Sequence, residues 1–138
     1  MQQHTDFWAG GFLYDRAKAS VFLHKRDGNT RMNPHKWAFF GGQNDPGETY
    51  LDCFVREIGE EIGLTIVPDQ AIPLREYWNP LVDQYRVVFY IESDVPAERL
   101  VLGEGAGFGW FTLDEAHRLD LAQKTREDLV YFVEHHLR

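Results

Sequence analysis

Three glutamates stand close together in the sequence, at positions 57, 60 and 61. Spacings of three and four residues place side chains on one face of an α-helix, so these three share a face if the segment is helical. Ionised carboxylates repel one another, which leaves two explanations for the cluster: a face open to water, or a bound cation. Clustered hard oxygen ligands suit Mg²⁺ or Mn²⁺, and such a cation would let an acidic protein bind polyphosphates.

The surrounding apolar residues predict the helix that must present these glutamates, over residues 48–62. Its apolar positions recur at the helical interval and are Leu51, Val55, Ile58 and Ile62. Thr49 and Asp52 have the spacing of a capping box at its start, and Gly63 suits its end. The glutamates then lie opposite the apolar stripe, on a solvated face in the last two turns. Because the helix dipole disfavours negative charge there, their position favours the cation.

Runs of β-forming residues on both sides of this helix predict strands. They cover residues 7–14, 20–25, 37–40, 72–78, 85–91 and 108–111, with the third stopped by the glycines at 41 and 42. Thr112 and Glu115 are expected to cap a short helix, and Thr125 and Asp128 a final one. The final helix is expected to have one apolar face, made of Leu129, Phe132, Val133 and His136. This irregular alternation predicts an α/β fold, a mixed sheet with helices packed against it, in a single domain over residues 1–138.

Residues 42–64 fit the Nudix box, G-x5-E-x7-R-E-U-x-E-E-x-G-U, where U is a bulky aliphatic residue. Every defined position is filled, by Gly42, Glu48, Arg56, Glu57, Ile58, Glu60, Glu61, Gly63 and Leu64. The flanking segments 22–26, 37–42 and 110–116 also resemble the Nudix family, so the likeness covers about residues 7–138. Phe40 departs from it, since many members have proline there. The resemblance implies a mixed β-sheet sandwiched between helices, an α/β/α sandwich.

The resemblance also implies a reaction. Nudix enzymes hydrolyse a nucleoside diphosphate linked to a group X, usually to a nucleoside monophosphate and phosphorylated X. A metal ion, Mg²⁺ or Mn²⁺, neutralises the diphosphate and lowers the pKa of the attacking water. By resemblance, Glu57 and Glu61 are the main metal ligands, and Glu60 is a further ligand or positions the water. The backbone carbonyl of Gly41 would add another oxygen.

Glu104 lies in the glycine-rich stretch LGEGAG before the last predicted strand. Some Nudix members, including oxidised-nucleotide pyrophosphatases, have a glutamate in such a loop, where it is a metal ligand or the general base. Glycines would supply the mobility that a closing loop needs. The alternative is an ordinary surface loop. The identity of the general base stays open among Glu57, Glu60 and Glu104.

Other charged residues have expected roles outside the metal cluster. By resemblance, Glu48 and Arg56 form an ion pair that fixes the loop against the helix, a structural role. Lys25, Arg26 and Arg31 are candidates for binding the phosphate or the base of the substrate. Scattered surface cations explain these three residues equally well.

Composition excludes several classes of protein. With 14 basic and 22 acidic residues the net charge is −8, which is unfavourable for binding a nucleic-acid polymer. The single cysteine, Cys53, excludes an internal disulfide and a cysteine-rich zinc site, and is expected to be a packed thiol. Neither a membrane span nor a signal peptide is visible. We therefore expect a cytoplasmic protein with a small nucleotide substrate and no membrane partner; a homodimer stays open.

The box does not specify the group X. The short chain and the Glu104 stretch favour a nucleoside triphosphate or an oxidised nucleotide, and nucleotide sugars also fit. Pro80, 16 residues after Leu64, instead resembles ADP-ribose pyrophosphatases, although any hairpin could use a proline there. Two other classes stay open: a Nudix-shaped binding module that has lost catalysis, and a purely structural acidic domain. The intact set of box glutamates argues against both.

Overall fold

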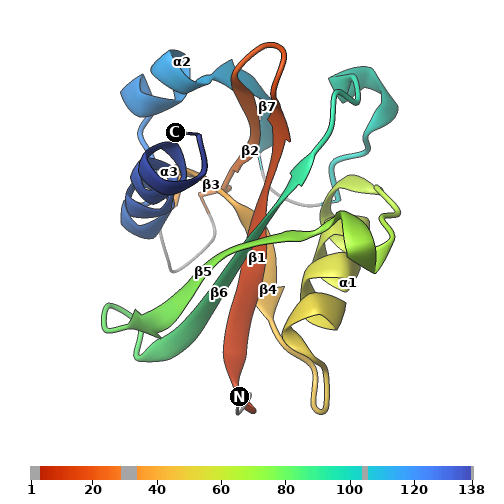
Figure 1. Ribbon diagram of the computed structural model, residues 1–138, viewed down its shortest axis with the longest axis vertical. Helices are drawn as coiled ribbons and strands as arrows, with labels where there is room; N and C mark the ends of the chain where they lie inside the picture. Colours follow the sequence, from red (N-terminus) through yellow and green to blue (C-terminus); the bar gives the residue numbers. More distant parts are fainter. Residues whose placement is uncertain (1–3, 29–33, 104–105, 138) are drawn as a thin grey trace.

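The computed structural model describes residues 4–28, 34–103 and 106–137, and these form a mixed α/β fold as expected (Figure 1). The strands of its sheet are β1 (Phe7–Asp15), β2 (Ser20–Lys25), β3 (Trp37–Ala38), β4 (Phe40–Gln43), β5 (Ile72–Asn79), β6 (Gln84–Glu92) and β7 (Gly107–Thr112). The α-helices are α1 (Tyr50–Ile62), α2 (Leu113–Arg118) and α3 (Gln123–His136), and short 3-10 turns lie at Pro68–Gln70 and Ala97–Arg99. No helix in the described ranges is long and apolar enough to cross a membrane.

Strand β1 is the centre of the sheet. Along one edge it pairs in parallel with β6, which in turn pairs antiparallel with β5. Its other edge is divided: residues 8–11 pair with β4 and residues 13–15 pair with β2, both antiparallel. Strands β3 and β7 both pair with β2. This division places β4 and its glycines beside the middle of the molecule, where α1 also packs.

The sheet has an apolar core on each face, which explains the sandwich. Side chains alternate along β1, so that Phe7, Ala9 and Leu13 pack with α1 while Phe12 and Tyr14 pack with α2 and α3. Figure 1 shows α1 on one side of the sheet and α2 with α3 on the other. The expected α/β/α arrangement is confirmed.

Local capping signals located the first two helices well. Helix α1 begins two residues later than expected, with the Thr49 hydroxyl accepting a hydrogen bond from the backbone N–H of Asp52 at 3.1 Å. It ends at Gly63, whose φ of 67° is the left-handed conformation that glycine adopts without a steric penalty. Thr112 and Glu115 form the expected capping box on α2.

The expectation that a strand stops at Gly41 and Gly42 is wrong. Strand β4 continues through both glycines because they pair with β1, Gly41 opposite Gly10 and Gly42 opposite Ala9. The strand expected over residues 37–40 is instead divided at Phe39 into β3 and β4. Tertiary pairing has therefore overridden the usual tendency of glycine to weaken a strand.

The expectation that Thr125 and Asp128 cap the last helix is also wrong. Helix α3 begins at Gln123 without a side-chain cap, and both residues lie inside it. The Thr125 hydroxyl accepts a hydrogen bond from the backbone N–H of Phe39 at 3.3 Å. Asp128 is fully buried, on the same side as the buried Leu129 and Phe132 of the expected apolar face. Both polar side chains thus bind the sheet beneath α3.

His24, on β2, is a buried histidine with only 4% of its surface exposed. Its Nε2 donates a hydrogen bond to the Phe39 carbonyl at 2.9 Å, and its ring stacks on Phe40 at a centroid distance of 4.7 Å. Burial lowers the pKa of His24 to about 4, a shift to which nearby Arg26 also contributes. The folded protein therefore holds this imidazole in its neutral form at neutral pH.

We expect His24 to make the protein less stable as the pH falls from about 6.5 towards 4. The folded pKa lies below the unfolded value, so the unfolded chain binds more protons in this window and stability falls as protons are added. Between pH 7 and 5 the loss amounts to about 2 kcal/mol. Urea denaturation at both pH values should show this extra loss in the wild type and in the control His117→Gln, but not in His24→Gln. An equal loss in all three proteins would contradict the assignment.

Candidate active site

Helix α1 presents its glutamates differently from what the sequence predicted. Glu57 and Glu61 are buried, with 9% and 4% of their surface exposed, and only Glu60 lies open to solvent. The expected solvated face is therefore wrong for two of the three carboxylates. Two segments from elsewhere in the chain cover this part of α1: β4 lies against Glu57, and the backbone N–H of Gly103 donates to the Glu61 carbonyl at 2.7 Å.

Two glycines allow the backbone to approach these glutamates closely. A side chain on Gly42 would collide with the carboxylate of Glu57, so the bare backbone of β4 lets that carboxylate lie against it. A side chain on Gly103 would likewise collide with the carbonyl of Glu60. Gly41 precedes Gly42 on β4, so its carbonyl belongs to the same stretch of backbone. Gly42 of the sequence motif and Gly103 outside it thus both have a steric function at this site.

Arg56 joins the loop before α1 to the carboxylates on the helix. Its Nε and one terminal nitrogen donate to the two oxygens of Glu48 at 2.7 and 2.9 Å, and this guanidinium lowers the pKa of Glu48. The other terminal nitrogen lies 3.2 Å from both Glu57 and Glu60. The ion pair that the family pattern implied is present, and it also neutralises part of the acidic cluster.

Cys53 lies one turn before Glu57 on α1 and is fully buried. Burial raises the pKa of its thiol to about 12. A thiol with so little thiolate at neutral pH is a poor nucleophile. The expectation of a packed thiol is confirmed.

The donors on α1 suit a hard divalent cation. Mg²⁺ commonly binds through one or two carboxylates and keeps several waters for substrate oxygens. Glu57 and Glu61 supply two carboxylates one helical turn apart, both held out of bulk water, with Glu57 against the backbone of β4. In the ranges that the structure covers, no group of three histidine, cysteine, aspartate or glutamate side chains could hold a metal ion. The residues therefore fit a two-carboxylate site completed by other oxygens; Glu104 lies outside the described residues.

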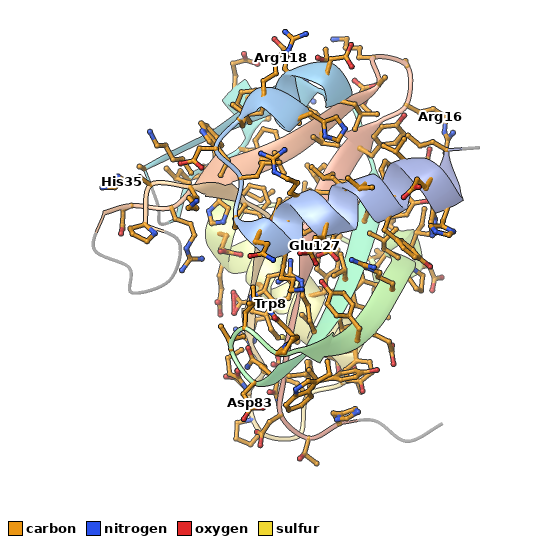
Figure 2. All side chains as sticks on the ribbon, turned by 90° about the vertical axis from the view of Figure 1, so that its left-hand side faces the viewer. Trp8, Arg16, His35, Asp83, Arg118 and Glu127 are labelled. Atoms are coloured by element: carbon orange, nitrogen blue, oxygen red, sulfur yellow. The ribbon has the colours of Figure 1, made fainter. Side chains whose placement is uncertain are left out.

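A cavity of about 330 Å³ opens on the other face of the sheet, under the start of α3. It is lined by Trp8, Arg26, Ala38, Phe39, Asn79, Leu81, Val82, Gln84, Arg86 and residues 122–125. Figure 2 shows Trp8 between α3 and the end of the β5–β6 hairpin, which is marked by Asp83. Of the three expected substrate-binding cations, Arg26 lines this cavity. Lys25 ends β2, and Arg31 lies outside the described residues.

Beside the cavity lies a buried ionic network that the sequence analysis missed. Asp128 accepts hydrogen bonds on one oxygen from Arg75 at 2.8 and 3.0 Å and from the Tyr77 hydroxyl at 2.8 Å, and on the other from Arg86 Nε at 2.9 Å. The guanidinium of Arg86 lies over the Trp8 ring, 4.1 Å from its centroid. The sequence did contain one signal of this network: Arg86 lies inside the apolar strand β6, and a buried arginine needs a partner of opposite charge.

The cavity and the carboxylate site adjoin the same short segment. Phe39 lines the cavity, and Gly42 lies against Glu57. These positions are three steps apart along the chain, a span of about 10 Å if it is extended. The cavity and the carboxylates thus lie on opposite faces of the sheet, at the two ends of the segment 39–42.

We expect Gly42→Ala to lower kcat about 10-fold or more, because the added methyl group must displace the Glu57 carboxylate. Misplacing a ligand by about 1 Å is enough for an effect of this size. Steady-state kinetics should be compared with those of Gly109→Ala, where the new methyl group makes only ordinary contacts with Phe111. Equal rates in the two variants would show that the close approach of β4 to Glu57 has no catalytic importance.

These features define a class of protein: an α/β/α sandwich in which a glutamate-rich helix lies against a glycine-containing strand. The model of the NUDIX domain family matches residues 8–132, most of the chain. The chain therefore belongs to the Nudix family, and it is a hydrolase acting on phosphoanhydride bonds, with nucleotides as its general substrate class. Enzymes of this family depend in general on a divalent metal ion.

Several individual proteins are similar to this chain. The nucleoside triphosphatase NudI of Enterobacter sp. (strain 638) is 32% identical over 117 residues, which is 78% of this chain and 83% of that protein. The MutT protein of Methanosarcina mazei Go1 has the same fold, with a TM-score of 0.77 over 100% of this chain and 99% of that one at 19% identity. A mutT/nudix family protein of Listeria innocua matches with a TM-score of 0.73 over 96% and 94% of the chains at 24% identity.

Proposed function

We propose that this chain is a metal-dependent nucleoside triphosphate pyrophosphohydrolase, which releases a nucleoside monophosphate and pyrophosphate. The observation that supports this most strongly is the pair of buried carboxylates, Glu57 and Glu61, with a cationic cavity near the other end of the segment 39–42. The cavity suits a nucleoside, and the carboxylates with Mg²⁺ or Mn²⁺ suit the phosphates. The similarity to a protein named nucleoside triphosphatase favours the same substrate class. A cytoplasmic location, where nucleoside triphosphates are used, belongs to this proposal.

Each residue near the carboxylates has a role in this proposal. Glu57 and Glu61 hold the metal ion, with the Gly41 carbonyl as a further oxygen ligand and Glu60 as a ligand or as the residue that positions water. When bound, the ion neutralises phosphate charge and lowers the pKa of the attacking water. Arg56 keeps the carboxylates and the preceding loop in place through its bonds to Glu48 and Glu57.

The chemical step is a hydrolysis and needs no other reactant. The oxygen of water bonds to a phosphorus of the α,β anhydride, and the bridging P–O bond breaks so that pyrophosphate and the monophosphate separate. One proton of the water passes to a carboxylate base. Glu60 is the α1 glutamate open to solvent, and it stays a candidate for this base together with Glu57 and Glu104.

A panel of substrates tests the proposal. Nucleoside triphosphates, nucleotide sugars, ADP-ribose and 8-oxo-dGTP would be incubated with Mg²⁺ or Mn²⁺, and the products separated by ion-exchange chromatography. We expect a triphosphate to give monophosphate and pyrophosphate, with the reaction abolished by excess chelator. Turnover undiminished by chelator, or cleavage of ADP-ribose in preference to every triphosphate, would contradict it.

The hairpin between β5 and β6 gives no support to the ADP-ribose alternative. Pro80 lies in its turn, where Asn79 accepts a hydrogen bond from the backbone N–H of Leu81 at 3.0 Å and Asp83 has a φ of 54°. These are ordinary requirements of a turn. The proline therefore needs no explanation from the substrate.

A further inference from the structure

Two arginines bind the same buried carboxylate from different sides of the network. Arg75 and Arg86 both donate to Asp128, and both guanidinium groups lie over aromatic rings. Their surroundings differ, however, because Arg86 lines the cavity under α3 and Arg75 does not. If the network only stabilised the packing of α3 on the sheet, substitution of either arginine should have the same effect on the protein.

Arg86 is held so that it can donate hydrogen bonds into the cavity. Its Nε is bonded to Asp128, and its plane is fixed over Trp8, which leaves the two terminal nitrogens for other acceptors. Guanidinium nitrogens donate and never accept, and their fork suits a pair of neighbouring acceptors. The other cationic lining residues are Arg26 and Lys124, and no carboxylate lines the cavity among the residues described.

This donor-rich lining distinguishes between nucleobases. Guanine offers O6 beside N7, cytosine offers O2 beside N3, and uracil and thymine have two oxo groups. Adenine has no oxo group, and its N7 acceptor lies beside the N6 amino donor. An amino group that faces a guanidinium donor leaves both groups without a partner, which is costly in a half-enclosed cavity.

We infer that Arg86 is a specificity-determining residue that favours nucleobases with oxo groups over adenine, and that Asp128 is the positioning residue that orients it. This inference rests on the proposed function, since it assigns the base of the substrate to the cavity. The selectivity due to Arg86 depends only on the base. ATP and the other nucleoside triphosphates carry the same phosphates, so they should bind the metal site in the same way.

The test compares kcat/KM for GTP, CTP, UTP and ATP in the wild type, Arg86→Gln and Arg75→Gln. We expect the wild type to favour at least one oxo base over adenine by about 10-fold or more, the discrimination typical of one bidentate pair. Arg86→Gln should reduce that ratio to within about threefold, through a higher KM for the favoured base at similar kcat. Arg75→Gln removes a partner of the same carboxylate outside the cavity, so it should keep the ratio.

Different outcomes separate the inference from the proposed function. Hydrolysis of triphosphates without discrimination against ATP, or with a ratio that survives in Arg86→Gln, overturns the inference and leaves the function standing. Loss of the ratio in Arg75→Gln to the same extent would show that the network acts through general stability. If no triphosphate is cleaved, the function fails, and calorimetric binding of GMP, CMP, UMP and AMP then decides the inference directly.

Asp128→Asn examines the positioning role. The amide keeps the shape of the side chain but loses the charge that orients Arg86. We expect the ratio to fall in this variant towards that of Arg86→Gln. A ratio equal to that of the wild type in a folded Asp128→Asn protein would overturn the assignment of Asp128. Arg86→Lys offers a second variant, since it keeps the charge and loses the planar fork.

Discussion

Glu61→Gln is expected to lower kcat at least about 100-fold and yet to raise the melting temperature of the metal-free protein. The activity falls because removing a group that stabilises transition-state charge commonly costs this much. The stability rises because Glu61 is 4% exposed and one turn from the buried Glu57. A neutral amide of similar shape avoids both the cost of burying a charge and the repulsion from its neighbour.

Calorimetric melting with and without Mg²⁺ provides a measurement independent of activity. A ligand that binds only the folded state stabilises it, so Mg²⁺ should raise the melting temperature of the wild type more than that of Glu61→Gln. Glu134→Gln removes the charge of an exposed glutamate on α3 and should match the wild type in both tests. Activity within about threefold of the wild type in Glu61→Gln would end its assignment as a metal ligand, and a lower melting temperature would make its role structural.

Glu57→Gln should lose activity to the same extent as Glu61→Gln, since both residues occupy the same face of α1. The carboxylate of Glu57 lies 3.2 Å from a terminal nitrogen of Arg56, so its charge is already partly compensated.

Most of the elements could be predicted from the sequence because their signals are local. The spacing of Leu51, Ile58 and Ile62 and the caps at Thr49 and Gly63 all lie within α1 itself. The burial of Glu57 and Glu61 could not be predicted in this way. It depends on β4 and on the chain near Gly103, which are separated from α1 in the sequence and approach it only in the folded protein.

The cavity on the other side of the sheet also could not be predicted from local sequence signals. Its walls come from β1, β6 and the start of α3, so no single stretch of sequence contains it. Thr125 and Asp128 have the spacing of a helix cap, and local reasoning assigned them that role. In the structure their partners are Phe39 and two arginines of the sheet, contacts that only the packing of α3 creates.

The strongest effect on stability is expected for Asp128→Ala, which should lower the free energy of unfolding by about 3–5 kcal/mol. Asp128 is fully buried and accepts hydrogen bonds from Arg75, Arg86 and Tyr77. Its removal would leave two guanidinium groups close together without their counter-ion. Burial and the charge of Asp128 together raise the pKa of Tyr77, so its hydroxyl stays protonated and donates a hydrogen bond. In Asp128→Ala this hydroxyl would lose its acceptor as well.

Urea denaturation measures the free energy of unfolding of Asp128→Ala and of Glu127→Ala. The comparison distinguishes the contribution of the buried ion pairs of Asp128 from that of an exposed pair on the same helix. Glu127 is bonded to Lys124 at 2.8 Å, but its side chain is 41% exposed, and such pairs contribute about 1 kcal/mol or less. Because the two residues are neighbours on α3, a difference in helix propensity cannot explain a large gap between the variants. A loss in Asp128→Ala no larger than that in Glu127→Ala would mean that the arginines find water or other partners when Asp128 is absent. Arg86 would then not depend on Asp128 for its place beside Trp8, and the positioning role would have no physical basis.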